Sequence, residues 1–158
     1  MTITEAQDIL HNYYDLTNPD EEERFLYMEA LDFLIHETGN DRYMVELGSH
    51  YYEARQFDLA LKYYELAAEC DNIDAMMGLG YICYYGRTGT RDYEKAYHYY
   101  ERARIRGNLV AEYKIADMYK NGYYVEQDRE RYRQIIESLY PKVCNARRLH
   151  APDRKSVV

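Results

Sequence analysis

The sequence predicts an all-α protein, an α-α superhelix (solenoid) of antiparallel helical hairpins, and three observations lead to this prediction. Residues between positions 60 and 92 recur 36 residues later along the chain, and a period of this size is typical of stacked helical units. Apolar and small residues within each copy follow helical spacing. The three prolines, Pro19, Pro141 and Pro152, all lie outside the repeating stretch, so long helices are permitted there.

The second copy of the repeat matches both the third and the first. Ala75, Leu79, Gly80, Gly86 and Asp92 match Ala111, Ile115, Ala116, Gly122 and Asp128, while Ala60, Tyr63, Tyr64, Glu65 and Ala67 match Ala96, Tyr99, Tyr100, Glu101 and Ala103.

Each copy is expected to contain two helices. In the first helix, Ala75, Leu79, Ile82 and Cys83 form one stripe at helical spacing, which predicts a buried face. A second helix is expected from Asp92 to Arg106, and Gly107 is the expected stop. Glycine inside a helix costs about 1 kcal/mol relative to alanine. Small residues at 48, 80 and 116 therefore predict close packing of neighbouring helices.

The stretch from Ala75 to Asn108 closely resembles the Sel-one-like repeat, a branch of the tetratricopeptide superfamily. The residues that carry the resemblance are Ala-x-x-x-Leu-Gly, then Gly-x-x-Gly, then Asp-Tyr-Glu-Lys-Ala-x-x-Tyr-Tyr-Glu-x-Ala and Gly-Asn. An earlier copy, Leu47-Gly48-x-x-Tyr51 followed by Leu59 to Glu69, has a linker four residues shorter. It is more similar to an ordinary tetratricopeptide unit.

Further helices are expected around these repeats. Thr4 to Leu16 and Asp20 to His36 form a predicted N-terminal pair, in which Phe25, Met28, Leu31, Phe33, Leu34 and Ile35 suit packing against the first repeat. The last copy departs from the pattern in its second helix and is expected to be a terminal, capping unit. Beyond Pro141 we expect one short helix carrying Val143, Ala146 and Leu149 and then a loose end.

The expected organisation has five parts. They are a helical hairpin at 1–40, a tetratricopeptide-like repeat at 41–73, a Sel-one-like repeat at 74–108, a degenerate terminal Sel-one-like repeat at 109–140 and a basic tail at 141–158.

The resemblance implies a partner-binding groove on the concave face that the first helices form. Transferring the family's groove positions gives the partner-binding candidates Arg42, Tyr52, Met77, Tyr81, Tyr84, Tyr85, Tyr113, Asp117, Lys120 and Asn121. The four candidates between 77 and 85 lie at i, i+4, i+7 and i+8, which places them on one helix face.

Tyrosine is unusually frequent, with 21 of 158 residues, and two interpretations are open. A tyrosine at a helix boundary can bury its ring and keep its hydroxyl in water, which suffices for Tyr63, Tyr64, Tyr99, Tyr100 and Tyr119. Tyrosines on the groove stripe can instead form a binding platform, because rigid aromatic rings are enriched at interfaces.

Charge is distributed unevenly. Residues 1–40 carry a net charge of −9 and residues 141–158 one of +4. The acidic run from Asp20 to Glu23 is typical of a helix start. The alternative is weak self-assembly, in which Arg147, Arg148, Arg154 and Lys155 of one copy contact the acidic end of another.

Other function classes have less support. A net charge of −8 opposes nucleic-acid binding, although the basic tail keeps that hypothesis open. The five histidines form no metal-binding pattern, and no nucleophile elbow or phosphate-binding loop occurs. The hydrolase activity associated with cysteine-rich Sel-one-like proteins is not transferred, since the paired cysteines of those proteins are missing. We therefore expect no catalytic residue, metal or cofactor.

The composition of the chain indicates the cellular compartment in which the protein is expected. No apolar run approaches the roughly 18 residues that a membrane span needs, and acidic residues near the N-terminus disfavour a secretory signal. Cys70, Cys83 and Cys144 suit small, buried thiols in a reducing compartment. We expect a cytoplasmic location. The resemblance implies an adaptor or scaffold role, usually bacterial, with a protein or peptide partner.

Overall fold

The computed structural model describes residues 1–150 of the protein, with side chains as far as Arg148. The described residues form helices and no strand, which confirms the all-α class. The helices are α1 Ile3–Tyr14, α2 Glu21–Thr38, α3 Asp41–Glu53, α4 Phe57–Glu69, α5 Ile73–Tyr85, α6 Tyr93–Ile105, α7 Leu109–Asn121 and α8 Arg129–His150.

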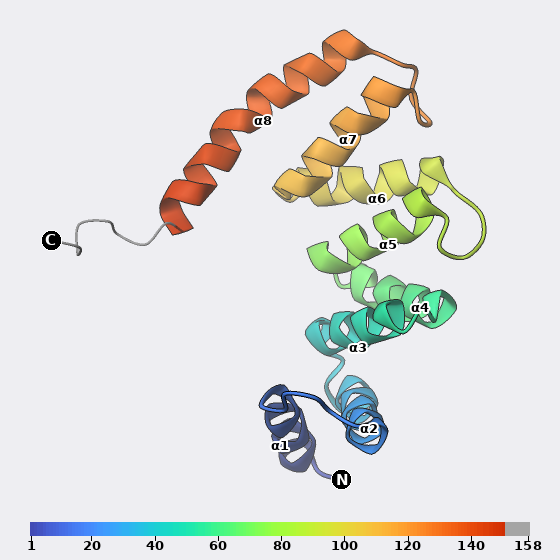
Figure 1. Ribbon diagram of the computed structural model, residues 1–158, viewed down its shortest axis with the longest axis vertical. Coiled ribbons are helices and arrows are strands. Elements are labelled where there is room, and N and C mark those ends of the chain that lie inside the picture. Colours follow the sequence, from blue (N-terminus) through green and yellow to red (C-terminus); the bar gives the residue numbers. More distant parts are fainter. Residues whose placement is uncertain (151–158) are drawn as a thin grey trace, which may run out of the picture. The chain divides into compact units, whose positions relative to one another are not determined.

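The chain forms two compact units. The first, Met1–Arg91, contains α1 to α5, and the second, which begins at Asp92, contains α6 to α8. In the first unit each helix packs against the next, so that the α1–α2 and α3–α4 hairpins follow one another and α5 packs on α4 (Figure 1). Its core consists of apolar side chains from every helix, among them Leu10, Tyr27, Leu31, Leu34, Leu47, Ala60, Tyr64 and Leu79.

The buried stripe expected in α5 is confirmed. Ala75, Leu79 and Ile82 are at most 1% exposed, and Cys83 is 9% exposed. The helix ends at Gly86, which adopts the left-handed conformation with φ 63°.

Glycines allow α3 and α5 to approach the ring of Tyr64 from both sides. A Cβ atom built at Gly48 would lie 2.9 Å from two carbons on one edge of the ring, and a Cβ at Gly78 would lie 2.7 Å from Cε2 on the other edge. The Tyr64 hydroxyl lies 3.1 Å from Oγ of Ser49. The close packing expected at Gly48 is therefore confirmed, while the role of Gly78 was not expected.

The first helices α3, α5 and α7 begin in the same way. Each has an asparagine N-cap, namely Asn40, Asn72 or Asn108, whose side chain accepts a hydrogen bond from a backbone N–H of the first turn. The residue before each asparagine has a positive φ: 63° at Gly39, 59° at Asp71 and 89° at Gly107. This turn ends one helix and starts the next.

The acidic run before α2 serves the helix itself. Asp20 is the N-cap, and its carboxylate accepts a hydrogen bond from the backbone N–H of Glu23 at 2.8 Å. The Glu23 carboxylate accepts one in return from the backbone N–H of Asp20 at 2.8 Å. These two acids form a capping box, as the helix-start interpretation requires.

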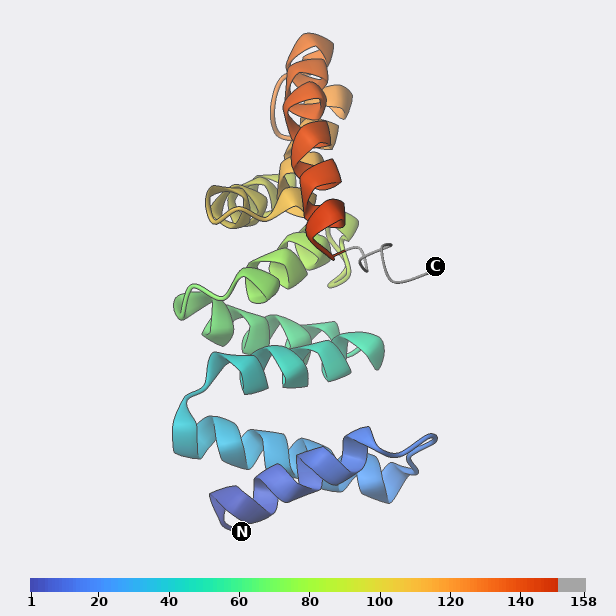
Figure 2. The same ribbon diagram turned by 90° about the vertical axis from the view of Figure 1, so that its left-hand side faces the viewer.

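In the second unit α7 packs against both α6 and α8 (Figure 2). Ala96, Tyr100 and Ala103 of α6 and Ala111 and Ala116 of α7 are fully buried. The rings of Tyr93 and Tyr123 stack with centroids 4.4 Å apart.

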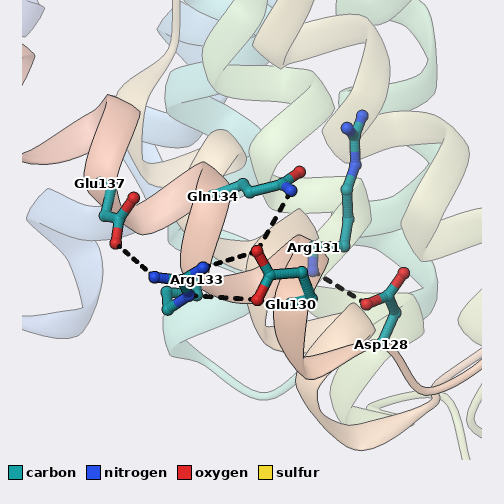
Figure 3. A network of polar contacts seen from close by, with 6 residues as sticks. All are labelled: Asp128, Glu130, Arg131, Arg133, Gln134 and Glu137. Atoms are coloured by element: carbon teal, nitrogen blue, oxygen red, sulfur yellow. Dashed lines mark hydrogen bonds and ion pairs between the residues drawn. The ribbon is translucent and has the colours of Figure 1, made fainter.

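Helix α8 starts in a network of charged side chains (Figure 3). The Asp128 carboxylate accepts a hydrogen bond from the backbone N–H of Arg131 at 2.9 Å, which caps the first turn. Arg133 donates two hydrogen bonds to Glu130, at 3.2 and 2.6 Å, and one to Glu137 at 3.3 Å. Solvent screens exposed pairs of this kind strongly, so they support the helix start without determining the fold.

The expectation of a separate short helix beyond Pro141 was wrong. α8 continues through Pro141 as far as His150. The helix packs against α7. Leu139, before the proline, is 6% exposed, and Lys142, after it, forms an ion pair of 3.1 Å with Glu112 of α7. The rest of the predicted tail, including Arg154 and Lys155, lies outside the described residues.

Two expectations about burial were also wrong. Leu31, Leu34 and Ile35 of α2 are buried as expected, but Phe25 is 63% exposed. Cys70 is exposed rather than buried, whereas Cys83 is buried, and all three cysteines are free. Apolar residues occur almost all around α2, so the sequence alone does not indicate which side is covered.

Candidate functional site

Several of the candidate tyrosines gather at one end of the first unit, where α3 and α5 end and α4 begins. There they meet a phenylalanine and an arginine. We call this group the aromatic cluster, and its members are Tyr52, Phe57, Tyr81, Tyr84, Tyr85 and Arg87.

The cluster begins at the turn between α3 and α4. Tyr52 lies near the end of α3, and Phe57 is the first residue of α4. Their ring centroids are 5.2 Å apart in an edge-to-face arrangement with an interplanar angle of 73°. Such pairs contribute about 0.5–1.5 kcal/mol beyond their buried area, so the two rings support each other.

Arg87 connects this pair to the end of α5. Its guanidinium carbon lies 6.0 Å from the centroid of Phe57 and 5.3 Å from the centroid of Tyr85. Cation–π contacts at exposed sites contribute about 0.5–1 kcal/mol each. The arginine therefore links rings that belong to two consecutive repeats.

Tyr85 lies at the centre of the α5 side of the cluster. Its ring is 4.9 Å from that of Tyr84, at an angle of 75°, and 6.3 Å from that of Tyr81, with which it stacks at 22°. Tyr85 is 42% exposed, while Tyr81, Tyr84 and Tyr52 are half-buried. The cluster thus combines one exposed ring with supporting rings beneath it.

The backbone after α5 explains the position of Arg87. Gly86 turns the chain with a left-handed φ of 63°, and the backbone N–H of Arg87 donates to the carbonyl of Ile82 at 3.0 Å. A Cβ at position 86 would lie 3.0 Å from the backbone nitrogen of Arg91. Glycine is therefore required both for the turn and for the close approach of the loop.

Two candidates in the first unit lie elsewhere. Met77 is 7% exposed, so it belongs to the core, and its expected place on an exposed stripe was wrong. Arg42 is exposed at the opposite end of α3 from Tyr52. It lines a cavity of about 310 Å³ between α1 and α3, together with Tyr14 and Glu46.

Beside this cavity two tyrosines bind one carboxylate. The hydroxyls of Tyr14 and Tyr27 both donate to Oε1 of Glu46. Burial, together with the bond to Glu46, raises the pKa of Tyr14 to about 12 and raises the pKa of Tyr27 well above its usual value. Both phenols therefore stay protonated near neutral pH, and the arrangement ties α1 and α2 to α3.

The remaining four candidates share α7 in the second unit. Tyr113 is 48% exposed. Asn121 donates to the carboxylate of Asp117 at 3.1 Å, and Lys120 lies with its Nζ 5.3 Å from the ring centroid of Tyr132 on α8. Asn121, Asp117 and Lys120 are thus engaged within the second unit, and Tyr113 is the aromatic member of this set.

Two members of the aromatic cluster were not among the sequence candidates. Phe57 follows Tyr52 by five residues across a short turn, and Arg87 follows the left-handed Gly86. The sequence indicated Phe57 in one way, because it lies directly across a short turn from another aromatic residue, Tyr52. No spacing rule points to Arg87, because its contacts depend on the path of the loop.

Among the residues that the structure describes, no group of three His, Cys, Asp or Glu side chains could hold a metal ion. None of the described helices is both long and apolar enough to cross a bilayer.

Solved structures show the same type of fold. A Sel1 repeat protein from Oxalobacter formigenes has 26% sequence identity and a TM-score of 0.60, over 73% of this chain and 89% of that one. A protective antigen with an SLR fold, c5321 of uropathogenic Escherichia coli, has 19% identity and a TM-score of 0.69 over 89% of this chain. This chain spans only 30% of that antigen. No curated protein matches the sequence.

The family model of the Sel1 repeat matches the chain three times, over residues 36–72, 73–108 and 109–131. The first match includes the copy with the shorter linker, and the second coincides with helices α5 and α6. The matches together cover more than half of the sequence. The chain therefore belongs to the Sel1 repeat family.

Proposed function

We propose that the protein is a non-catalytic adaptor that binds a peptide or helix of another protein along α3 and α5, the first helices of the first unit, with the aromatic cluster as the main contact. Sel1 repeat proteins generally act as protein–protein interaction modules. The proposal adds a specific surface to this general role. It also includes a cytoplasmic location, which the three free cysteines support.

The observation that carries the proposal is the linked set of rings around Arg87. Tyrosine, tryptophan and arginine are the residue types most enriched among interface hot spots. Here the exposed ring of Tyr85 is held by Arg87 and by two further tyrosines, which fix its position before another protein binds. A preorganised ring loses little conformational entropy on binding, which favours affinity.

The acidic N-terminal end is a weaker basis for function. Two of its acids, Asp20 and Glu23, form the capping box of α2. The structure therefore gives these residues a local role, and we do not base a self-assembly function on them.

Affinity capture with mass spectrometry from the source cell tests the proposal. Three baits are compared: the wild-type protein and the variants Tyr85→Ala and Arg87→Ala. The matched control is Tyr140→Ala, because Tyr140 is 71% exposed on α8 and far from the cluster in sequence. Circular dichroism first establishes that every variant is folded. We expect the control to retain the partners of the wild type and the cluster variants to lose them.

The affinity of the identified partner is then measured by calorimetry. Truncation of a hot-spot residue costs about 2–4 kcal/mol, which corresponds to a loss of roughly 30-fold or more. Unchanged affinity in both Tyr85→Ala and Arg87→Ala would remove the aromatic cluster from the proposal.

A further inference from the structure

A second surface of the first unit carries an apolar and acidic groove that the aromatic cluster does not include. It has a volume of about 660 Å³ and runs along α2, opposite residues of α3 and α4. Phe25, Met28, Glu29, Asp32 and Phe33 line it from α2, and Tyr63 lines it from α4. We call it the α2 groove.

The apolar part of the groove is incompletely covered in the first unit. Phe25 is 63% exposed, although the neighbouring Leu31, Leu34 and Ile35 of the same helix are buried. Phe25, Met28, Asp32 and Phe33 follow one another at helical spacing, so they form one continuous stripe. A contiguous apolar patch of this kind, unlike singly scattered apolar side chains, can mark an interaction surface.

The polar part of the groove is acidic. Glu29 is exposed on α2, and the Asp32 carboxylate accepts a hydrogen bond from the Tyr63 hydroxyl at 3.1 Å. His36 lies 3.7 Å from the other oxygen of Asp32. The side chains that line this groove, all within the described part of the chain, include neither lysine nor arginine.

The charge of the surrounding unit has the same sign. Residues 1–91 contain 18 aspartates and glutamates but only 6 lysines and arginines, a net charge of −12 with histidine neutral. The nearest base on α4, Lys62, lies with its Nζ 5.2 Å from the centroid of Tyr63. An electrostatic field of this kind attracts basic partners and repels acidic ones.

We propose that the α2 groove binds a basic amphipathic helix of a partner protein. From Phe25 to Phe33 the stripe spans eight residue steps, which is about 12 Å or roughly two helical turns. This length suits a helix that presents apolar anchors at i, i+3 or i+4, and i+7. The anchors pack on Phe25, Met28 and Phe33, and lysines or arginines at the flanks face Glu29 and Asp32.

This surface is distinct from the proposed adaptor site. The α2 groove is lined mainly by α2, with Tyr51 of α3 and Tyr63 of α4, whereas the aromatic cluster consists of other residues at the ends of α3 and α5 and the start of α4. Variants of one therefore leave the other intact, and the two proposals can fail separately.

The probe is a fluorescein-labelled synthetic helix of about 18 residues, with leucines on one face and lysines on the other. A matched peptide carries glutamate in place of each lysine. Binding to the full-length protein is followed by fluorescence anisotropy at low and at moderate salt. We expect the lysine peptide to bind, the glutamate peptide to bind at least about tenfold more weakly, and the affinity of the lysine peptide to fall as salt rises.

Two variants test the location. Phe25→Ala removes an exposed ring and should leave the fold intact, as circular dichroism will establish, and we expect it to weaken binding by about tenfold or more. Glu29→Lys should weaken binding by at least about fivefold and flatten the salt dependence. The control Asp8→Lys makes the same charge change at an exposed position on α1 and should change the affinity by less than about twofold. Tyr85→Ala, in the aromatic cluster, should also change the affinity by less than about twofold.

The other outcomes overturn the proposal. Equal binding of the two peptides, or wild-type affinity in Phe25→Ala, would show that the groove does not select a basic amphipathic helix. Loss of binding in Tyr85→Ala alone would place the peptide on the aromatic cluster. A concentration-dependent dimer that Phe25→Ala dissociates would make a second copy of this chain the occupant instead.

Discussion

At the residue scale, the packing of Tyr64 shows what one sequence can and cannot predict. A glycine inside a helix predicts a close approach, and Gly48 confirms this. The sequence did not indicate that the ring between the helices belongs to Tyr64, nor that Gly78 faces its other edge. Both facts depend on how α4 sits between α3 and α5, and this arrangement involves residues far apart in the chain.

Replacing Gly78 by alanine should destabilise the first unit. The added Cβ would lie 2.7 Å from the Tyr64 ring, and overpacking typically costs about 1–3 kcal/mol, whereas the gain in helix propensity is only about 1 kcal/mol. We expect urea denaturation to show a free energy of unfolding lower by up to about 2 kcal/mol. In a Tyr64→Leu background the same substitution should cost less or become favourable. An equal cost in both backgrounds would contradict the packing that the structure shows.

Tyr63 should make stability depend on alkaline pH. Burial and the hydrogen bond to Asp32 raise the pKa of Tyr63 from 10.0 to about 12. Because the folded pKa is above the unfolded one, the protonated phenol contributes stability that is fully present below about pH 10 and is lost as the pH rises towards 12. Tyr63→Phe lacks this contribution. The stability difference between wild type and variant, measured by urea denaturation at about pH 8 and about pH 11.5, should therefore shrink at the higher pH. A constant difference would refute the assignment.

At the element scale, α8 shows where local sequence rules fail. A proline usually marks a helix boundary, because it removes a backbone hydrogen bond and its ring crowds the preceding turn. Here tertiary contacts on both sides, Leu139 before the proline and the Lys142–Glu112 ion pair after it, keep the helix continuous. By contrast, the stripe of α5 was predicted correctly, since helical spacing within one segment is local information.

Replacing Pro141 by alanine should stabilise α8. Alanine restores the missing backbone donor, and a proline in a helix interior costs about 3 kcal/mol, so thermal unfolding of the second unit should shift upwards. Hydrogen exchange of residues 142–148 should slow at the same time. Ser138→Ala, at an exposed position of the same helix, is the control for propensity alone and should have a much smaller effect. Faster exchange in Pro141→Ala would show that the proline supports the helix.

At the scale of the whole molecule, the repeat in the sequence was sufficient to predict the family and the all-α class, because both follow from a short self-similar pattern. The candidate site was predictable only in part. Tyr52, Tyr81, Tyr84 and Tyr85 could be placed on helices, but their meeting with Phe57 and Arg87 depends on the turn at Gly86. The groove beside Phe25 was missed because α2 is apolar on several sides.

The charge distribution allows a test of head-to-tail association. The N-terminal acids Asp20 and Glu23 are used in a cap, and Lys142 is paired with Glu112, so we expect little charge-driven contact between copies. Sedimentation velocity should give the same sedimentation coefficient at about 20 mM and about 300 mM salt. Over this range the Debye length falls from roughly 20 Å to about 6 Å, so an association driven by charge would weaken. A faster species at low salt alone would instead support self-assembly through the two ends.

The turn that joins the repeats has a consequence for how such chains can grow. A segment that starts at Asn72 and ends at Gly107 brings its own cap for the first helix and its own left-handed terminator after the second. Duplicating this segment in the gene would create no helix that lacks a beginning or an end. Array length in this family can therefore change by insertion of whole segments, while the existing helices keep their boundaries.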